Sequence, residues 1–310
     1  MHQVLNMTES VPLKKYELVD HPKLIMTILV KDEADVIEHN ILFHKSQGVD
    51  AFIATDNNST DGTREILQKY KDKGWILELI DEPDDSLRQK DWVHRMIRKS
   101  KDYAPDWIIN ADADEFWISK TGNLKDEIRN FTGGKIYVPS YHMRDKNGEL
   151  FYENTEQIVR LFSKYYRYYL ICRGKLCRYS QLTFGLPKVM HRMKDYRMIH
   201  MGNHWVNMDQ PSEERNANSL YINHYNVRGR EQFKRKMILG AEACERNLKL
   251  GKGAARHWRY FLERYRNGVN MDDEYERMVG NLCLKEMSKY HLCDIDNTVR
   301  DFFHNRTQES

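Results

Sequence analysis

An apolar run that ends in a cluster of carboxylates limits most strongly what this chain can fold into. Residues 106–117 read Asp-Trp-Ile-Ile-Asn-Ala-Asp-Ala-Asp-Glu-Phe-Trp. In a strand, side chains two residues apart point to the same face, so Asp112 and Asp114 would leave a buried strand on one side. Two neighbouring carboxylates repel each other unless a cation lies between them, and hard oxygen ligands suit Mg²⁺ or Mn²⁺. The segment therefore predicts a metal clamp for a diphosphate at a strand end.

Upstream of this segment, strand-like apolar runs alternate with segments of helical spacing. The strand-like runs are residues 23–30, 51–55, 75–80 and 107–111. Helical spacing fills the three intervals between them, with Gly48 after the first helix and Asp61 as the N-cap of the second. This order predicts a parallel sheet with helices on both faces. Three polar segments each follow a strand, so the topology would gather them at the carboxyl edge of the sheet, where ligands bind. They are residues 31–33, 56–58 and 112–114.

The regular alternation ends after Trp117. Apolar patterns predict a short helix over residues 124–131 and strands over 135–141 and 219–225. Residues 149–206 mix aromatic, basic and apolar side chains, which favours strands of a mixed edge joined by long loops. From Gly229 onward, apolar residues recur every three or four positions, as in helices. We therefore expect a lead-in over residues 1–22, a sheet domain over 23–227 and a helical C-terminal region over 228–310.

Charge is nearly balanced overall but unevenly spread. The net charge is +3, whereas residues 160–200 hold ten Lys or Arg against one acid, and residues 228–266 hold twelve against four. Such stretches attract anions, which include phosphates, nucleic acids and acidic membrane surfaces. For either stretch alone, a solvated face is the simpler explanation. Two of them downstream of a carboxylate cluster favour an anionic substrate or a membrane contact.

Cysteine usage and apolar runs indicate the compartment. The five Cys residues are irregularly spaced, which favours free thiols over a zinc site and fits a reducing cytoplasm. Residues 1–16 lack the apolar core of a signal peptide, and no apolar run reaches the roughly 18 residues that a spanning helix needs. We therefore expect a cytoplasmic protein without a transmembrane helix.

Four segments together resemble a known enzyme family. Residues 53–63 resemble the second-strand motif of family 2 glycosyltransferases, and residues 112–116 resemble their metal-binding DxD motif. Residues 202–206, and residues 222–225 followed by Arg228 and the segment 231–236, are similar to the bacterial branch of that family. The resemblance covers roughly residues 23–240. It implies the GT-A fold, a Rossmann-like α/β architecture with a mixed, mostly parallel sheet flanked by helices, here followed by a helical C-terminal extension.

The resemblance also implies an activity. It implies an inverting glycosyltransferase that uses Mn²⁺ or Mg²⁺ to move a sugar from a nucleotide-diphosphate donor, with UDP-sugars favoured. The acceptor would be a glycan or a lipid-linked molecule in surface polysaccharide or lipopolysaccharide synthesis. Donor contacts are expected from Val30, Lys31, Glu33, Asp56, Asn58, Lys90, Asp112 and Arg228. Metal ligands are expected from Asp112, Asp114, His204 and His224, with Asp114 central to catalysis.

An inverting transfer also needs a general base on the acceptor hydroxyl. In this fold the base tends to come from the loops well downstream of the DxD motif, which here are residues 195–209. The candidates are Asp195, His200, His204 and Asp209, although His204 could instead be a metal ligand. The cluster Tyr165–Tyr169 fits either stacking on an acceptor sugar or packing of an edge strand. Asp56 likewise fits either binding of the base or the formation of a turn.

Three other functions have weaker support. A nucleotidyltransferase of similar fold would carry a Gly-rich basic loop after its first strand, but residues 31–35 contain no Gly. A haloacid-dehalogenase-type phosphatase places its Asp-x-Asp on the first strand rather than the fourth. A basic nucleic-acid-binding protein would show a recognised motif, and we find none, so no nucleic acid partner is expected. The basic C-terminal helices could seat the enzyme peripherally on an anionic inner membrane.

Overall fold

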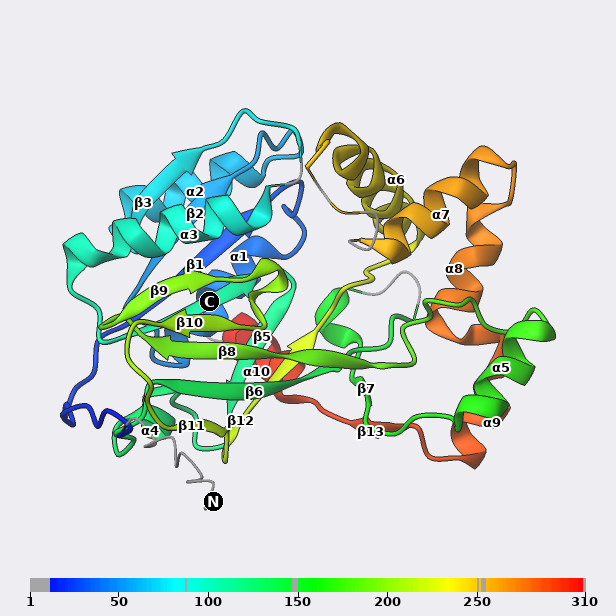
Figure 1. Ribbon diagram of the computed structural model, residues 1–310. Coiled ribbons are helices and arrows are strands. Elements are labelled where there is room, and N and C mark those ends of the chain that lie inside the picture. The colour runs from blue at the N-terminus through cyan, green and yellow to red at the C-terminus, as the bar shows by residue number, and fades with distance from the viewer. Residues whose placement is uncertain (1–11, 87, 147–149, 250, 252–254, 309–310) are drawn as a thin grey trace, which may run out of the picture.

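The computed structural model describes residues 12–86, 88–146, 150–249, 251 and 255–308, and Figure 1 shows its arrangement. Strands and helices alternate through the first part, as predicted. The elements are β1 (Leu24–Val30), α1 (Ile37–Ser46), β2 (Ala51–Asp56), α2 (Thr63–Asp72), β3 (Ile76–Asp81), α3 (Gln89–Ser100) and β4 (Trp107–Asp112). Gly48 follows the C-cap of α1 with φ 93°, which confirms its predicted role as a helix stop.

The middle of the chain completes the sheet. Its strands are β5 (Glu115–Ser119), β6 (Lys135–His142), β7 (Glu156–Ile158), β8 (Phe184–Arg192), β9 (Tyr196–Ile199), β10 (Val206–Met208), β11 (Glu214–Asn216) and β12 (Leu220–His224). Its helices are α4 (Lys125–Ile128) and α5 (Lys164–Cys172). The last part contains α6 (Arg230–Arg246), α7 (Arg256–Arg266), α8 (Met271–Val279), α9 (Leu284–Lys289), β13 (Cys293–Ile295) and α10 (Thr298–Gln308).

The main sheet is mixed but mostly parallel. Its order is β3-β2-β1-β4-β8-β6-β12-β5, with β11 beside β6. The first four strands of this order run parallel to one another, whereas β8 is antiparallel to both β4 and β6. Strand β12 is parallel to β6 and antiparallel to β5. This confirms the predicted α/β class, with a Rossmann-like half in the order 3-2-1-4.

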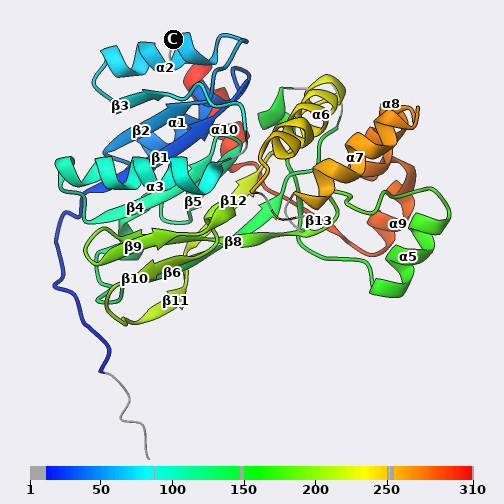
Figure 2. The same cartoon turned by 45° about the horizontal axis from the view of Figure 1, so that its top comes forward.

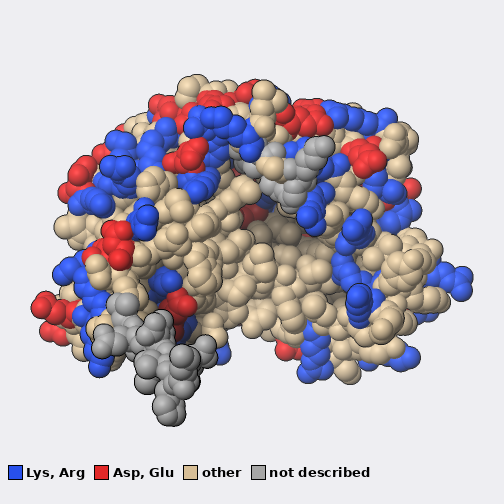
Figure 3. Space-filling model, viewed as in Figure 1, with Lys and Arg blue, Asp and Glu red and all other residues tan. Residues whose placement is uncertain are grey.

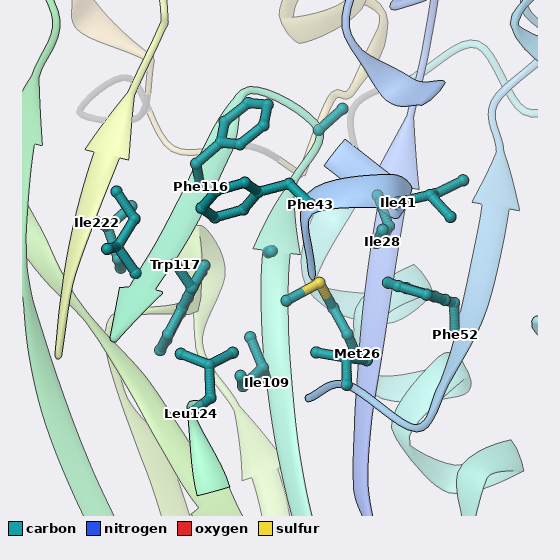
Figure 4. Close-up of a cluster of buried hydrophobic side chains, with 14 of the residues drawn as sticks. Met26, Ile28, Ile41, Phe43, Phe52, Ile109, Phe116, Trp117, Leu124 and Ile222 are labelled. Carbon is teal, nitrogen blue, oxygen red and sulfur yellow. The ribbon is translucent and has the colours of Figure 1, made fainter. Parts of the chain in front are cut away.

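Two apolar cores lie on opposite faces of the sheet, because successive strand residues point to opposite sides. Leu24, Met26 and Ile28 of β1 join the core under α1 and α2, whereas Ile25 joins the core under α3 and the β9–β10 hairpin. Figure 4 shows Met26 and Ile28 beside Ile41 and Phe43 of α1. Burial of each such side chain contributes roughly 1.5–3 kcal/mol, so the two cores hold the strand order in place.

Three local predictions are corrected. Residues 115–119 form strand β5, which pairs with β12 and was hidden by the acidic motif before it. The Tyr165–Tyr169 cluster lies on helix α5, not on an edge strand, because Ser163 caps the helix and accepts from the Tyr166 N–H. Gly62 rather than Asp61 occupies the N-cap of α2. Asp61 lies one residue before this N-cap, and its carboxylate accepts a hydrogen bond from the Thr63 N–H.

A helical lobe stands beside the sheet, on the right in Figures 1 and 2. Helices α6, α7 and α8 share one apolar core, and α5 and α9 contribute Leu170 and Met287 to another. The chain then returns to the sheet, because β13 pairs with β7 and α10 adds Val299 and Phe303 to the core under α1. The expected region 228–310 is thus divided between lobe and sheet domain. Part of the expected lead-in, residues 1–11, lies outside the described residues.

Two further expectations concern thiols and membrane helices. The five cysteines are free thiols, as predicted, and Cys172 is exposed. In the part of the chain that the structure describes, none of the helices combines the length and apolar character needed to cross a bilayer.

Candidate active site

Strand ends meet at one edge of the sheet. Val30 pairs with Asp56, Asp56 pairs with Asp81, and Asp112 pairs with Leu29. Because these strands are parallel, the residues that follow them all leave the sheet on the same side. Farther along the same edge, His224 at the end of β12 pairs both with His142 of β6 and with Glu115 of β5. The structure therefore brings together the polar segments 31–33, 56–58 and 112–114.

Hydrogen bonds connect the loop after β1 to the loop after β2. The Asp32 carboxylate accepts from the Thr60 N–H at 2.8 Å, and the Asp32 N–H donates to the Ser59 hydroxyl at 2.9 Å. The Lys31 ammonium donates to the Asn57 carbonyl at 2.9 Å. Asp56 accepts from Ser59, which is the turn-forming role, and burial raises the pKa of its carboxyl. Asn58 follows in the turn with a φ of 55°, which Asn tolerates well.

Asp114 is surrounded by cations. It is 2% exposed, and its carboxylate lies 2.5 Å from the Lys236 ammonium, 3.3 Å from His224 Nε2 and 3.6 Å from the Arg228 guanidinium. Burial alone would raise the pKa of Asp114, but the charges of Lys236, His224 and Arg228 outweigh it and hold that pKa well below its ordinary value. Asp114 is therefore ionised at neutral pH.

Arg228 joins this carboxylate to the loop after β1. Its side chain is buried and forms ion pairs with Glu33 and, at 2.7 Å, with Asp35, while it also donates to the Tyr225 carbonyl at 3.0 Å. Burial lowers the pKa of Arg228, but the charge of Glu33 and the other acids raises it overall. Burial raises the pKa of Glu33, and the nearby cations oppose that rise. Arg228 was predicted as a donor contact, and here it organises the acids of the site.

A second ion-pair group lies on the other side of Asp112. The Lys188 ammonium, on β8, lies 3.0 Å from the Asp112 carboxylate and 2.7 Å from the Glu115 carboxylate. Glu115 is fully buried, and burial raises its pKa despite the charge of Lys188. Sequence reasoning missed Lys188; its only signal is a lysine directly before the apolar pair Val189 and Met190. A buried lysine needs carboxylate partners, which here come from another strand.

Three histidines border these groups. His224 would have its pKa lowered by burial, but Asp114 raises it overall. The rings of His224 and His142 lie 5.4 Å apart, and burial lowers the pKa of His142 to about 4. His204 Nδ1 lies 2.9 Å from the Pro187 carbonyl, so Nδ1 carries the proton and donates it. Burial and the nearby Lys188 charge lower the pKa of His204, which leaves Nε2 as an unprotonated acceptor at neutral pH. His142 was not predicted.

Two predicted residues lie elsewhere or at the margin. Asp195 follows the end of β8 that pairs with Trp107, the first residue of β4, so it lies at the opposite end of the sheet from Asp112. There it forms an ion pair with Lys14 and accepts from Tyr16 at 3.0 Å. Lys90 lies in the first turn of α3 beside Gln89, whose amide donates to Asp112 at 3.3 Å.

The acids of the site outnumber the bases, which bears on metal binding. Within residues 12–86, 88–146, 150–249, 251 and 255–308, no group of three or more His, Cys, Asp or Glu is placed to hold a metal ion. The ion-paired groups nevertheless include five carboxylates against three Lys or Arg. The carboxylates are Glu33, Asp35, Asp112, Asp114 and Glu115, and the bases are Lys188, Arg228 and Lys236. The site therefore carries more carboxylates than Lys and Arg side chains to balance them.

The surface beside the site is hollowed. Figure 3 shows a hollow between the sheet and the helical lobe, below α6 and α7, with acidic atoms at its upper end. Strand β8 begins at this hollow, since its first residues run below α6 in Figure 1. The site can therefore be approached by a second molecule from the side of the lobe.

Distant structural similarities accompany a clear family match. S. aureus TarS 1–349, solved with UDP-GlcNAc, is 12% identical over 82% of this chain and 78% of that chain, with a TM-score of 0.40. Glucosyl-3-phosphoglycerate synthase from Mycobacterium tuberculosis, solved with Mn²⁺, UDP and glucosyl-3-phosphoglycerate, is 14% identical over 72% of this chain and 80% of that chain, at 0.34. The mannosyltransferase PcManGT from Pyrobaculum calidifontis, solved with GDP-Man and Mn²⁺, is 16% identical over 43% of this chain and 39% of that chain, at 0.33. These similarities are weak, and the assignment rests on the family match.

No curated protein matches the chain. The family model that matches is that of glycosyltransferase family 92, over residues 29–249, and not that of family 2, which the sequence motifs resemble. The matched residues run from the end of β1, through both ion-pair groups, to just beyond α6. Because this is more than half of the chain, the protein belongs to glycosyltransferase family 92 and is a glycosyltransferase.

Proposed function

We propose that this glycosyltransferase is metal-dependent and inverting, and that it moves a sugar from a nucleotide-diphosphate donor, a UDP-sugar, to a glycan or lipid-linked acceptor. The observation that carries the proposal is the position of Asp112 and Asp114 at the carboxyl edge of parallel strands, with fixed cations beside them. The Asp-x-Asp pair thus keeps the role that its resemblance to the DxD branch of family 2 implies.

The donor would lie along the ends of β1, β2 and β4. Val30, Lys31 and Glu33 would border the base and ribose, with Asp56 and Asn58 on the neighbouring strand end. The register that pairs Val30 with Asp56 supports this, because it places both at one edge. Lys90 in the first turn of α3 would approach the donor from the same side as Gln89, which already contacts Asp112.

A divalent ion fits between this donor and the acids. Asp114 and His224 would hold it, with Asp112 as a further candidate ligand, and the phosphate oxygens of the donor would complete its shell. His204, which the sequence also offered as a ligand, is assigned to proton abstraction instead. Mg²⁺ sites on nucleotides commonly use only one or two carboxylates plus substrate phosphates. When bound, the ion would stabilise negative charge on the departing diphosphate.

Arg228 and Lys236 would assist at the same diphosphate. Both are positively charged groups beside Asp114, and both sit at the start of α6, or just before it, over the carboxyl edge. Hydrogen bonds between a cation and a phosphate oxygen are about twice as strong as neutral ones. The two residues would therefore bind the donor and favour release of the diphosphate as the bond to the sugar breaks.

His204 is the better candidate for the general base. Its Nδ1–H is held by the Pro187 carbonyl, which aims a neutral Nε2 away from that contact. The pKa of His204 is lowered by burial, so the group can accept a proton at neutral pH. Asp195, another candidate, faces Lys14 and Tyr16 at the far end of β8. We therefore assign proton abstraction to His204 and not to Asp195.

A thermal-shift experiment tests the donor and the metal together. UDP-glucose, UDP-galactose, UDP-GlcNAc and GDP-mannose are each added with Mn²⁺, with Mg²⁺ or with EDTA. A ligand at about 100 times its Kd stabilises the fold by about 2.7 kcal/mol, so the true donor should raise Tm only when the metal is present. Asp114→Asn should lose this shift, whereas Asp301→Asn, an exposed carboxylate on α10, should keep it. Stabilisation by none of the four donors in either metal would overturn the proposal.

We also propose that the enzyme acts in surface-glycan synthesis while seated peripherally on an anionic membrane. The exposed basic and apolar residues after α6, such as Arg256 and Leu248, support such a seat. Co-sedimentation with phosphatidylglycerol vesicles at low salt tests it. Binding should disappear at high salt, and no binding at low salt would rule the seat out.

A further inference from the structure

Four aromatic side chains continue the open face of β6 and β8 beside His204. We call this set the aromatic strip; it consists of Tyr137, Tyr141, Phe184 and Trp205. Tyr137 and Tyr141 lie four residues apart on β6 and so share a face. Tyr141 pairs with Phe184 across the strands, and their ring centroids lie 6.5 Å apart. Tyr137 packs against Trp205 with centroids 5.8 Å apart.

The strip lies at the margin of a sheet face that is otherwise buried. Helix α3 and the β9–β10 hairpin cover this face where Val189 and Tyr137 lie. The cover stops at Trp205, which is 49% exposed, and Phe184 farther along is 47% exposed. Large aromatic rings that stay half exposed on one sheet face are a common mark of a binding surface.

A bulge in β8 connects the strip to the candidate base. The register between β6 and β8 shifts between Val138 and Ser140, which leaves one extra residue on β8 near Pro187. The carbonyl of Pro187 is the group that accepts from His204. Bulges bend a strand and are frequent beside active sites, where they aim a side chain. Here the bulge holds His204 at the end of the strip.

The next residue of β8 leads to the donor edge. Lys188 forms ion pairs with Asp112 and Glu115. Along β8, Phe184 therefore belongs to the strip, Pro187 contacts the candidate base, and Lys188 contacts the acids of the donor site. The β6 partners of Phe184 and Lys188 are Tyr141 and Val138, three residues apart, which puts about 10 Å between Phe184 and Lys188. A molecule lying on the strip would therefore present one end at His204 and at the sugar of the donor.

The charges around the strip favour a neutral occupant. Lys135 lies over the Trp205 ring, but its ammonium is paired with Glu214 at 2.5 Å. Lys188 is paired with two carboxylates. Both of these lysines are thus already neutralised, whereas a lipid phosphate would need a cation of its own. Sugar rings carry no charge, and their C–H faces stack on aromatic rings while their hydroxyls stay in water.

We propose that the aromatic strip is the acceptor subsite and that the acceptor is a neutral glycan, with sugar rings stacked on Phe184 and Trp205. This rests on the proposed function of the site. The acceptor hydroxyl lies at His204 Nε2, which takes its proton. Its oxygen forms the new bond to the anomeric carbon of the donor sugar, while the bond from that carbon to the diphosphate oxygen breaks and its electron pair leaves with the diphosphate.

Ligand-observed NMR with the full chain tests the strip directly. The probes are cellobiose, lactose, maltose and N,N′-diacetylchitobiose, with decyl phosphate as the probe for a lipid acceptor. We expect at least one disaccharide to bind saturably. Phe184→Ala and Trp205→Ala should weaken that binding about five- to tenfold, and Trp205→Phe should restore most of it, because a ring remains. Tyr265→Ala, on the 51% exposed ring of α7, is the matched control and should bind as the wild type does.

Kinetics separates the strip from the donor site. With the donor found by thermal shift, Phe184→Ala should raise the acceptor KM about five- to tenfold without a matching rise in the KM for the donor. The inference is overturned if wild type binds decyl phosphate and none of the disaccharides, if it binds no probe, or if the ring variants bind disaccharide as tightly as wild type. Failure of every nucleotide sugar to stabilise the fold would instead overturn the proposed function, and the NMR result would not depend on it.

Discussion

At the scale of single residues, burial and charge act in opposite directions on two histidines of the site. Burial lowers the pKa of His204, and the neighbouring Lys188 charge lowers it further. Burial would do the same to His224, but the Asp114 carboxylate 3.3 Å away raises its pKa overall. The pKa values of the two rings are therefore shifted in opposite directions. A neutral His204 suits proton abstraction, and a His224 next to a carboxylate suits contact with an ion or a phosphate.

The lowered pKa of His204 predicts the pH dependence of transfer. The base is active when deprotonated, so the rate should rise with pH through a pKa below the ordinary value of about 6.5 and be level above it. His204→Gln should lower kcat by about 10²- to 10⁴-fold and remove this limb, with the thermal shift by donor retained. The measurement is a pH–rate profile between pH 5 and 8. A profile that loses its limb in Asp195→Asn rather than in His204→Gln would move the base to Asp195.

At the scale of elements, helix α6 has two different faces. Phe233 and Met237 join the apolar core of the lobe with α7 and α8. The opposite side reaches the acidic sheet edge through ion pairs, in which Lys236 contacts Asp114 and Arg246 contacts Asp85 at 3.0 Å. Apolar packing thus holds α6 on the lobe, and ion pairs connect it to the acidic edge of the sheet. A helix held in this way can alter its contacts at the site without loss of its own packing.

This division predicts that Lys236 matters to the donor and not to the fold. Lys236→Met keeps the apolar stem and removes the ammonium, so donor affinity should fall about tenfold or more, because a hydrogen bond to a charged group contributes about 1.5–3 kcal/mol. The control is Lys234→Met on the same helix, whose ammonium pairs with Glu231 and Asp272 instead. Calorimetric titration with the donor and Mn²⁺ measures both variants. Equal affinity for the two would contradict a donor role for Lys236.

At the scale of the whole molecule, the last helix packs against the first. Helix α10 packs Val299 and Phe303 into the core under α1, and the Phe43 ring contacts Phe302 with centroids 5.3 Å apart. The path to α10 runs through the lobe and through β13, which pairs with β7. The first helix and the last thus share one core, so sheet domain and C-terminal segment should unfold together.

A single substitution in α10 tests this coupling. Phe303 is 7% exposed, so Phe303→Ala should lower the free energy of unfolding by about 3 kcal/mol or more through lost burial and a cavity. In urea the midpoint should fall while a single transition remains. Leu248→Ala, at a side chain that is 96% exposed, should change stability by less than about 0.5 kcal/mol. Two separate transitions in wild type would show that the C-terminal segment folds on its own.

Much of the fold could be predicted because its signals are local. The apolar runs of β1, β2, β3 and β4 mark buried strands, and the helical spacing between them marks the crossovers. Asp112 and Asp114 were found because they directly follow such a run. Strand β5 was missed because it is only five residues long and directly follows an acidic motif. Helix α5 was missed because it is rich in tyrosine and buries one residue, Leu170, so it shows no clear helical period.

The site itself depends on contacts between distant parts of the chain. Lys188 reaches Asp112 across 76 residues, and Lys236 reaches Asp114 across 122. Neither pair has a spacing that a sequence pattern could reveal. Asp195 shows the converse, because it was predicted from its place downstream of the DxD motif. Strand β8 runs antiparallel to β4, so its C-terminal end, and Asp195 with it, lies at the opposite end of the sheet.

The sequence by itself determined which residues are buried in strands, which polar segments follow those strands and, through parallel topology, that these segments meet at one edge. The tertiary structure decided which cations face the carboxylates, which histidine is held neutral and which aromatic rings remain exposed beside it. The physical reason is one of range. Burial is read from a period of two to four residues along the chain, whereas an ion pair or an open sheet face depends on strand order and direction, which only the assembled sheet defines.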